Sequence, residues 1–535
     1  MAPPIKIKKT EPPSPMEKNS LDRLAAARIN KYLWGIDFRE CYFFAAPHRQ
    51  RQIYSQSPPP VQRLLDAPEL QTSLAFDLCG EFVTEIVNTF MPEAQNWVAA
   101  GKGMFIKQDQ WQQVAEIAKA NDEAIFDAIK SSNFYAELPK AYDPDLAIGT
   151  SAMWIEQPQM HRAITCTAVS LRELECSLGP YGEVDDRFVV RWTKRRYVKA
   201  LLPGITLPQA ILDKIDKDPE TVINVTWGYW RLWERPDECW QHVVMVDDKL
   251  VHQAELQGEG SCPLIVTRFN PSADWVWGIG PMFKTLPDHR QVDELEASKI
   301  KVVQRNIDGP VAFPDDSFAN VAQGLEDGFA YPVRPGTTRD SVFAIYPQIN
   351  MEPATYQHEE MEHRMRRLFY IDFPQQSGDT PPTAAQWMDE LARAQRRIGT
   401  PGMSFWREGP MQYYLRYKYL LERNGAIVPL QIQGKTVSAR PLNPAQRAAE
   451  QQEVAIAAQF LQIVNGAWQE EAKMAIDGTK SIKNLRDKMR VTLIAMRDPD
   501  QVDKFIKQIT PLLQQRIGPG VPQQAGEPQP AGPMQ

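Results

Sequence analysis

The segment 286–424 constrains the fold of this chain more than any other part of its sequence. It predicts one helix over 287–305 and a second over 354–371, and each carries an apolar seam so narrow that both of its flanks are polar. Between them, prolines and glycines divide residues 308–352 into short apolar pieces such as 342–346, which favour strands. Helices of this kind bury little surface in a single chain, whereas a barrel of identical neighbours would cover their flanks.

The charges of the first of these helices follow simple electrostatic rules. Pro287 stands just inside its start, where a missing N–H costs nothing, and Asp288 lies in the first turn, as the helix dipole favours. Its last half carries the basic residues Lys299, Lys301 and Arg305. The two apolar seams consist of Val292, Leu295, Val302 and Val303 in the first helix and of Tyr356, Met361, Met365, Leu368 and Phe369 in the second.

The chain length, the net charge and the spacing of the cysteines limit the classes of protein to which this chain can belong. The chain of 535 residues is long enough for roughly three or four domains. A net charge of −7 argues against a sequence-specific DNA-binding protein, but it allows a surface that DNA passes without being held. Neither a membrane span nor a signal peptide is predicted. The six cysteines lack a CxxC spacing and indicate reduced, mostly buried thiols of a cytosolic protein, rather than disulfides or a zinc site.

The N-terminal part of the chain is predicted to be helical. Residues 1–20 are rich in Pro, Lys and Ser and are expected to form a disordered arm, with a helix beginning at Ser20. Apolar residues at helical spacing predict further helices over 73–91 and 108–131. These apolar stripes are interpreted as core.

The pattern changes to that of strands after residue 146. Between 146 and 269, β-branched and aromatic segments separated by turns predict an antiparallel β region, with hairpin reversals at 179–186 and 247–248. After the long helical stretch that follows 384, a short strand is expected over 426–433, and then C-terminal helices. The final residues, 517–535, are rich in Pro, Gly and Gln and are predicted to be disordered.

No catalytic, cofactor-binding or metal-binding motif is found. His358 and His363 partly resemble the zinc-binding HExxH pattern of a helix. However, the two histidines are five residues apart instead of four, so their side chains diverge by roughly 140° around the helix axis. The chain has no phosphate-binding GxxxxGK[ST] loop, and Gly278 and Gly280 lack the context of a dinucleotide loop. Asp185 and the neighbouring Asp186 are interpreted as turn residues rather than metal ligands.

The sequence contains two basic clusters, and the role of each has more than one interpretation. Lys194, Arg195 and Arg196 lie between Trp192 and Tyr197, either as an aromatic and basic nucleic-acid surface or as the ordinary alternation of a strand. The second cluster shares one helix face and would contact DNA, a neighbouring subunit or solvent. It consists of Arg393, Arg396 and Arg397.

Six segments, read in order, resemble the portal (head-to-tail connector) protein of short-tailed bacteriophages. They are WGIDFRECYFFAAPHRQR (34–51), SLAFDLCGEFVTEIVNTFMPEAQNW (73–97), LAIGTSAMWIEQ (146–157), PLIVTRFNPSADWVWGIGPMFKTLPDHRQVDEL (263–295), PPTAAQWMDELARAQRRIG (381–399) and VSARPLNPAQRAAEQQ (437–452). The most specific part is the succession of Arg268, WGIGP (277–281) and LPD (286–288). Trp277 and Ile279 stand where the family often has Tyr and Arg, which leaves the form of the local turn open.

The resemblance implies a mixed α+β, elongated protomer with wing, stem, clip and helical crown regions. The protomers would form a homo-dodecameric ring at one capsid vertex of the virion, assembled in the host cytoplasm. Double-stranded DNA would be pumped through the ring by a separate terminase large subunit, retained, and later ejected through the tail. The other implied partners are the major capsid protein, the scaffold and tail adaptor proteins; neither a membrane nor a cofactor is implied.

The resemblance also implies a position for each region. They are a disordered arm (1–20), the wing (21–285), stem helix 1 (286–305), the clip (306–353), stem helix 2 (354–373), a channel loop (374–383), a long wing helix (384–425), a connecting strand with the crown (426–516) and a disordered tail (517–535). The loop would face the DNA in the channel. Its candidate residues are Pro374, Gln375, Gln376, Ser377, Gly378, Asp379 and Thr380.

Two rival functions come from other classes. A scaffold or tail-adaptor protein without a channel would share much of this composition. An enzyme of nucleic-acid metabolism would need a phosphate-binding loop or a convergent set of acidic residues, and neither is found in the sequence.

Overall fold

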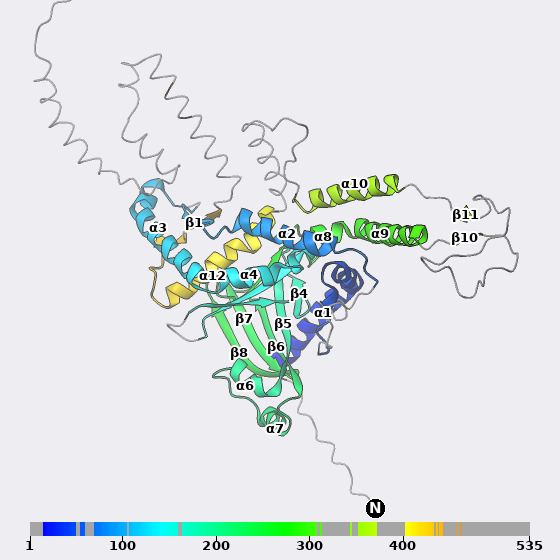
Figure 1. Cartoon of the computed structure of the whole chain (residues 1–535). Helices are drawn as coiled ribbons and strands as arrows, with labels where there is room; N and C mark the ends of the chain where they lie inside the picture. The colour runs from blue at the N-terminus through cyan, green and yellow to red at the C-terminus, as the bar shows by residue number, and fades with distance from the viewer. Residues whose placement is uncertain are drawn as a thin grey trace, which may run out of the picture. The chain divides into compact units, whose positions relative to one another are not determined.

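The computed structural model describes residues 14–49, 54–58, 69–103, 106–158, 163–307, 351–371 and 402–432, with short pieces at 311–312, 343–344, 435–436, 438–441, 457 and 462. The chain divides into two compact units, 1–445 and 446–535. Almost all described residues belong to the first unit, and the fold below is that of this unit (Figure 1). The predicted crown helices, both predicted disordered ends and the channel loop lie outside the described residues, apart from residues 14–20, 457 and 462.

The first helix, α1 (Pro15–Ala45), begins earlier than predicted. The hydroxyl of Ser14 accepts a hydrogen bond from the backbone N–H of Glu17, and Pro15 occupies the first turn, so both residues favour a helix start here. Ser20, the predicted start, is fully buried inside the helix. The predicted disordered arm therefore does not extend to residue 20, because Ser14 and Pro15 were missed as a capping pair.

Four α-helices follow α1 in the chain and precede the strands of the two main sheets. α2 (Leu74–Phe90) ends before Met91-Pro92 as predicted, and α3 (Gln108–Ser131) has the predicted bounds. The short helices α4 (Phe134–Tyr142) and α5 (Asp145–Ile148) lead into the first sheet strand. One face of α2 is buried, which confirms that its apolar stripe belongs to the core.

Two antiparallel sheets confirm the predicted β region. The smaller sheet has the order β3 (Thr165–Val169), β2 (Thr150–Glu156), β9 (Leu264–Arg268), and the larger has the order β4 (Leu174–Leu178), β5 (Val184–Lys194), β6 (Val222–Arg231), β7 (Cys239–Val246), β8 (Lys249–Gln257). Asp247 and Asp248 join β7 to β8 with φ of 54° and 58°, the left-handed pair that a tight hairpin turn requires. β4 and β8 were not predicted.

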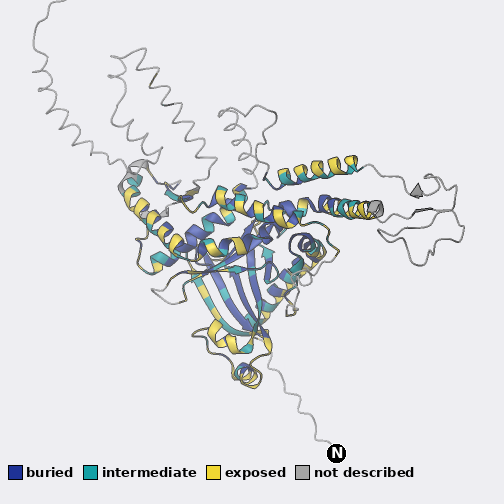
Figure 2. Ribbon diagram, in the orientation of Figure 1, coloured by how far each residue is buried: buried dark blue, intermediate teal, exposed yellow. Residues whose placement is uncertain are grey.

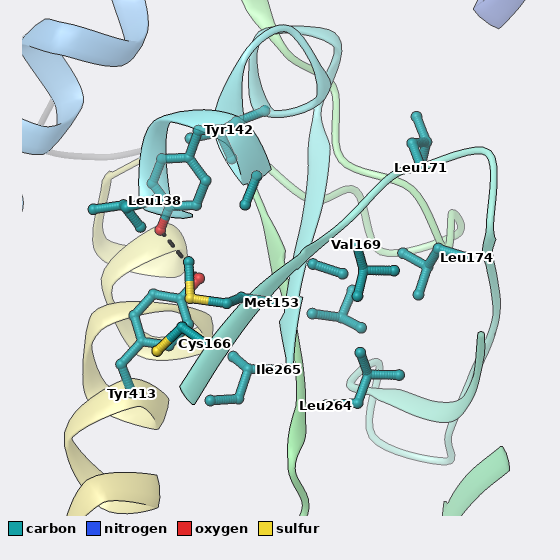
Figure 3. Close-up of a cluster of buried hydrophobic side chains, with 14 of the residues drawn as sticks. Leu138, Tyr142, Met153, Cys166, Val169, Leu171, Leu174, Leu264, Ile265 and Tyr413 are labelled. Atoms are coloured by element: carbon teal, nitrogen blue, oxygen red, sulfur yellow. Dashed lines mark hydrogen bonds between the residues drawn. The ribbon is translucent and has the colours of Figure 1, made fainter. Parts of the chain in front are cut away.

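The two faces of the larger sheet are covered differently. One face carries Phe188, Val190, Val243 and Met245, against which α1 packs through Leu24 and Ala27. The other face belongs to the main core of the unit, together with the smaller sheet and the helices. Figure 3 shows part of this core, where the hydroxyl of Tyr142 in α4 donates to that of Tyr413 at 3.3 Å, beside Met153, Cys166 and Ile265.

The remaining described elements are short. They are η1 (Pro47–Arg49), β1 (Val98–Gly101), η2 (Arg195–Tyr197), α6 (Val198–Leu201), α7 (Gln209–Lys217), α8 (Pro281–Lys284), β10 (Val311–Ala312), β11 (Phe343–Ala344), β12 (Gln431–Ile432), β13 (Lys435–Thr436) and β14 (Ser438–Pro441). β14 pairs antiparallel with β1, and β12 with β13. β11 lies inside the strand predicted over 342–346, and it pairs with β10.

The predicted long helix over 384–425 is not continuous in its described part. Residues 402–408 are helical, Gly409 is not, and α12 (Pro410–Arg423) then begins. Pro410 has no N–H and its ring clashes with the carbonyl four residues earlier, which favours a kink or a break in the helix at this position. The prediction was wrong here because it did not take the helix-breaking effect of Gly409 and Pro410 into account.

All six cysteines are free and buried, which confirms the predicted burial of the thiols. Among the helices that the structure describes, none combines the length and apolarity needed to span a membrane.

Candidate functional site: the paired helices and their anchor

Two helices of the unit, α9 (Leu286–Ile307) and α10 (Glu352–Leu368), run beside each other (Figure 1). The carboxylate of Glu296 in α9 lies 2.8 Å from Lys299 and 3.0 Å from Nδ1 of His358 in α10. Arg364 of α10 lies 3.7 Å from Asp288. We call α9 and α10 the helix pair; they confirm both helices that the sequence predicts after residue 286.

The apolar seam of the helix pair is buried at one end and exposed at the other (Figure 2). Val292 and Met365 are fully buried, as is Phe369 directly after α10. In contrast, Val303 is 48% exposed and Tyr356 is 70% exposed. These two were expected to face the seam within the pair, and in the single chain nothing among the described residues covers them.

The basic residues predicted on α9 are not brought to one common site. Lys299 is half-buried against Glu296, whereas Lys301 is exposed. Arg305 lies in the last described turn of α9, and its side chain lies outside the described residues. No ion pair is therefore assigned to Lys301 or Arg305.

The base of the helix pair is anchored by aromatic packing. His289 of α9 is fully buried, with its ring stacked on Phe44 at 5.9 Å and set edge-on to Phe369 at 6.2 Å. No hydrogen-bond partner for either ring nitrogen is found among the described residues. Burial lowers the pKa of His289 to about 4, so the imidazole is neutral at physiological pH. Phe82 of α2 contacts both Phe269 and Phe369 and joins this base to the core.

Arg268 at the end of β9 ties four segments of the unit together. Its guanidinium pairs with the carboxylate of Glu408, with one contact of 2.5 Å, and the side chain is only 2% exposed. It also donates to the carbonyl of Gly182 at 2.9 Å and to that of Val276 at 3.3 Å. Such a buried, multiply bonded guanidinium is a structural clamp.

The WGIGP turn (277–281) is in direct backbone contact with the start of the smaller sheet. The N–H of Gly278 donates to the hydroxyl of Thr150, and that of Gly280 to the carbonyl of Ile148, both at 2.9 Å. A Cβ at Gly278 would lie 2.1 Å from the carbonyl oxygen of Gly149. The two glycines therefore serve close backbone approach, and Trp277 packs edge-on against Phe38 at 5.6 Å.

A third contact joins α1 and η1 to the start of α5 and to the residues before β4. Asp145, which is almost completely buried, accepts from the Tyr42 hydroxyl at 2.7 Å, from Arg49 at 3.2 Å and from the N–H of Leu171 at 2.8 Å. Burial raises the pKa of Asp145, and the nearby Arg49 guanidinium opposes this. The segments that begin at residues 34, 146 and 263 thus meet around the base of the helix pair.

The three cations of the basic cluster at the end of β5 pair with two carboxylates of the same chain. Lys194 lies 2.7 Å and Arg196 2.5 Å from the carboxylate of Glu220, and Arg195 lies 3.7 Å from Asp218. The strand ends at Lys194, and the next residues form η2 rather than continuing the alternation. This arrangement gives no support to a free basic surface. The cluster Arg393, Arg396 and Arg397 lies outside the described residues.

No metal site is found among the described residues. Asp185 accepts hydrogen bonds from the N–H of Arg231 at 2.7 Å and from the indole of Trp233 at 2.9 Å, and Asp186 pairs with Arg23 at 2.6 Å. These partners explain the two carboxylates without a cation.

Two buried cations were missed by sequence reasoning. Lys31 of α1 donates to the carbonyls of Arg172 and Leu174 at 2.9 and 2.8 Å and lies 3.3 Å from Glu175. Arg416 of α12 donates to the carbonyl of Ser261 at 2.7 Å. Both lie within helices whose sequence patterns give no signal of a buried cation, because their partners are mainly backbone carbonyls of distant segments.

Comparison with known proteins adds the following. A search of curated protein sequences finds no match. Among solved structures, the chain is similar to one titled "Virion of native gene transfer agent (GTA) particle", with 11% identity, a TM-score of 0.33 and coverage of 75% of this chain and 92% of that chain. It is also similar to "Neck of empty GTA particle computed with C6 symmetry", with 12% identity, a TM-score of 0.31 and coverage of 78% and 90%.

The sequence itself matches a family over most of its length. The matched residues are 18–492, and they include every described element of the helix pair, its anchor and both sheets. The family is described as "Bacteriophage head to tail connecting protein". The chain therefore belongs to the family of bacteriophage head-to-tail connecting proteins.

Proposed function

We propose that this protein is the portal of a short-tailed bacteriophage. Its copies form a dodecameric ring at a unique capsid vertex, and the ring is the conduit through which a separate terminase motor packages the genome. The same channel retains the DNA and releases it through the attached tail. The protein is assembled in the host cytoplasm and becomes part of the virion.

One observation of the fold carries this proposal beyond the family. The helix pair is anchored at its base by buried residues such as His289 and Phe369, while Ile300, Val303 and Tyr356 farther along are 41%, 48% and 70% exposed. Exposed apolar groups on a paired helix favour coverage by another protein surface. Identical neighbours arranged around an axis supply such a surface at every position of the ring.

The regions of the portal are assigned to the chain as follows. The wing comprises 21–285 and the helix 384–425, with its break at Gly409. The stem comprises 286–305 and 354–373, and the clip 306–353, in which β10 pairs with β11. The crown comprises the C-terminal part of 426–516.

The channel loop is assigned to 374–383. Its residues 375–380 carry a single formal charge, that of Asp379, so the loop would press against DNA without the phosphate contacts that would arrest it. Replacing 375–379 by two glycines should leave ring assembly intact but impair packaging or DNA retention in particles. The matched variant with Gln375→Lys and Gln376→Lys should slow DNA passage, more so at low salt. Particles with the shortened loop that fill and hold full-length genomes would overturn this assignment.

The proposed portal has no enzymatic activity of its own. The family is structural, and we propose that ATP hydrolysis belongs to the terminase large subunit. The other partners proposed are copies of this chain, double-stranded DNA, the major capsid protein, the scaffold and tail adaptor proteins. Robust nucleotide hydrolysis by the purified protein would contradict this part of the proposal.

The mass of the assembled protein tests the proposal against its rivals. Native mass spectrometry should give one closed assembly whose mass is an integer multiple of the chain mass. An adaptor or enzyme that remains a monomer across protein and salt concentrations would contradict the portal assignment.

A further inference from the structure

Helix α1 is apolar on two opposite sides. Its buried residues Leu24, Ala27 and Phe38 pack on the larger sheet and the main core. At about 100° per residue, Ile29 and Ile36 lie on the other side of the helix, where they are 61% and 79% exposed. A helix that is apolar all round is normally buried all round, so the second side of α1 is a candidate contact surface.

The exposed side of α1 has the spacing of a seam between two helices. We call its residues the outer row, and they are Ala26, Ile29, Tyr32, Leu33 and Ile36. Apart from Tyr32, which widens the row, they recur at intervals of three and four residues, as the core positions of a coiled coil do. Tyr54 contacts the edge of the row at Tyr32, with 5.7 Å between the ring centroids, but Tyr32 and Leu33 remain 67% and 69% exposed. Contiguous exposed apolar groups of this kind mark an interaction surface.

The two ends of the outer row carry opposite charges. Asp22 stands four residues before the row and Arg39 three residues after it, and both are exposed. No ion-pair partner for either is found among the described residues, whereas the adjacent Glu40 is already paired with Arg290 of α9. Two such helices laid antiparallel bring each Asp22 near the Arg39 of the other helix, and a parallel pair brings like charges together. The row is therefore complementary to itself in the antiparallel direction.

We propose that the outer row of α1 is a contact between two copies of this chain, packed antiparallel about a two-fold axis. In this contact Ile29 of each copy faces Leu33 of the other, and Ala26 faces Ile36. A two-fold contact uses the same surface on both copies, so it joins two partners and does not by itself close a ring. The inference is therefore independent of the ring, and the contact joins either two single chains or two rings.

Charge reversal at the two ends gives the sharpest test. Asp22→Arg brings like charges together at both ends of the contact, and so does Arg39→Asp. Each full-length variant should therefore dissociate at about tenfold higher concentration than the wild type. An equal mixture of the two variants should associate as tightly as the wild type, because opposite charges then meet at both ends. Analytical ultracentrifugation measures all four samples.

The mixture separates a second copy from any other occupant of the outer row. A different protein, or another segment of the same chain, cannot respond to mixing two variants of this chain. A mixture that associates no more tightly than either variant alone would overturn the proposal, and so would variants that associate like the wild type.

The mass of the assembly gives an independent check. Leu33→Glu places a charge in the middle of the outer row, and we expect it to halve the mass measured by light scattering while circular dichroism stays unchanged. Ile117→Glu on α3 is the matched control, since Ile117 is 45% exposed outside α1, and it should leave the mass unchanged. An unchanged mass of Leu33→Glu at every protein concentration would overturn the proposal. A fall from rings to single chains would also overturn it, because Leu33 would then belong to the ring contact.

Discussion

Arg268 donates hydrogen bonds to four residues of the unit. Its guanidinium satisfies Glu408 and the carbonyls of Trp275, Val276 and Gly182, which belong to segments far apart in the sequence. Because Glu408 and the carbonyls of Trp275 and Val276 are half-buried and would lose this donor, the side chain stabilises the meeting of the segments and not only its own strand.

Replacing this arginine should be costly. Arg268→Met keeps most of the side-chain volume but leaves Glu408 and the carbonyls without their donor, so we expect the free energy of unfolding to fall by about 3–5 kcal/mol. Arg290→Met is the matched control, since Arg290 pairs with Glu40 at an exposed position, and it should cost no more than about 1 kcal/mol. Urea denaturation measures both. Equal effects of the two substitutions would show that the clamp is not structural.

His289 should make the protein sensitive to acid. Its pKa is lowered from 6.5 to about 4 by burial, so the unfolded chain binds a proton at a higher pH than the folded chain does. The stability that the neutral ring contributes is complete above pH 6.5 and is lost as the pH falls toward 4. The loss amounts to about 3 kcal/mol.

Thermal denaturation between pH 7 and pH 4 tests this residue. His289→Leu removes the buried base, so its melting temperature should fall less with decreasing pH than that of the wild type. Part of the slope should remain, because burial also lowers the pKa of His242 to about 4. His363→Leu, on the exposed side of α10, is the control and should keep the wild-type slope. A His289→Leu profile parallel to the wild type would refute the role of this ring.

At the scale of elements, two glycines differ in what surrounds them. Gly278→Ala would place a Cβ 2.1 Å from the carbonyl oxygen of Gly149, so the turn or the strand start must move, and we expect a loss of about 3 kcal/mol or more. Gly80 of α2 has open space around it, so Gly80→Ala should stabilise the protein by up to about 1 kcal/mol. Chemical denaturation of both variants checks the pair. A harmless Gly278→Ala would disprove the close backbone contact.

The sequence correctly predicted the features that depend only on residues close together in the chain. The bounds of α3, the end of α2 before Pro92 and the turn at Asp247 and Asp248 follow from helical spacing, a missing N–H and left-handed backbone geometry. β8 was missed because its residues are half-buried or exposed and carry few large apolar side chains. The anchor around His289 could not be predicted, since its aromatic partners come from segments far apart in the chain.

The sequence predicted the helices of the candidate site but not the contacts between them. The two helices after residue 286 were found, together with a strand between them. The pattern of charged residues in α9 did not reveal that the Glu296 carboxylate contacts both Lys299 and His358. A sequence does not show which faces of two helices meet. The predicted seam was wrong at Val303 and Tyr356, which are 48% and 70% exposed, and the proposed ring would cover both.

At the scale of the whole molecule, the exposed end of the helix pair should govern assembly. Ile300→Glu combined with Val303→Glu places charges where neighbouring copies would bury apolar groups, and we expect closed assemblies to be lost while the monomer stays folded. Lys301→Glu on the same helix is the matched control for added negative charge and should retain assembly. Size-exclusion chromatography with light scattering and circular dichroism measures both properties. Unchanged assembly of the double variant would place the subunit contact elsewhere.

The central claim is that copies of this chain close around a channel bordered by the helix pair. Cryo-electron microscopy of the purified full-length protein tests it most directly. We expect closed rings with a central pore, in which α9 and α10 of every copy line the wall and contact the neighbouring copies. Compact monomers at all concentrations and salts, or rings in which the helix pair lies away from the pore, would contradict the account.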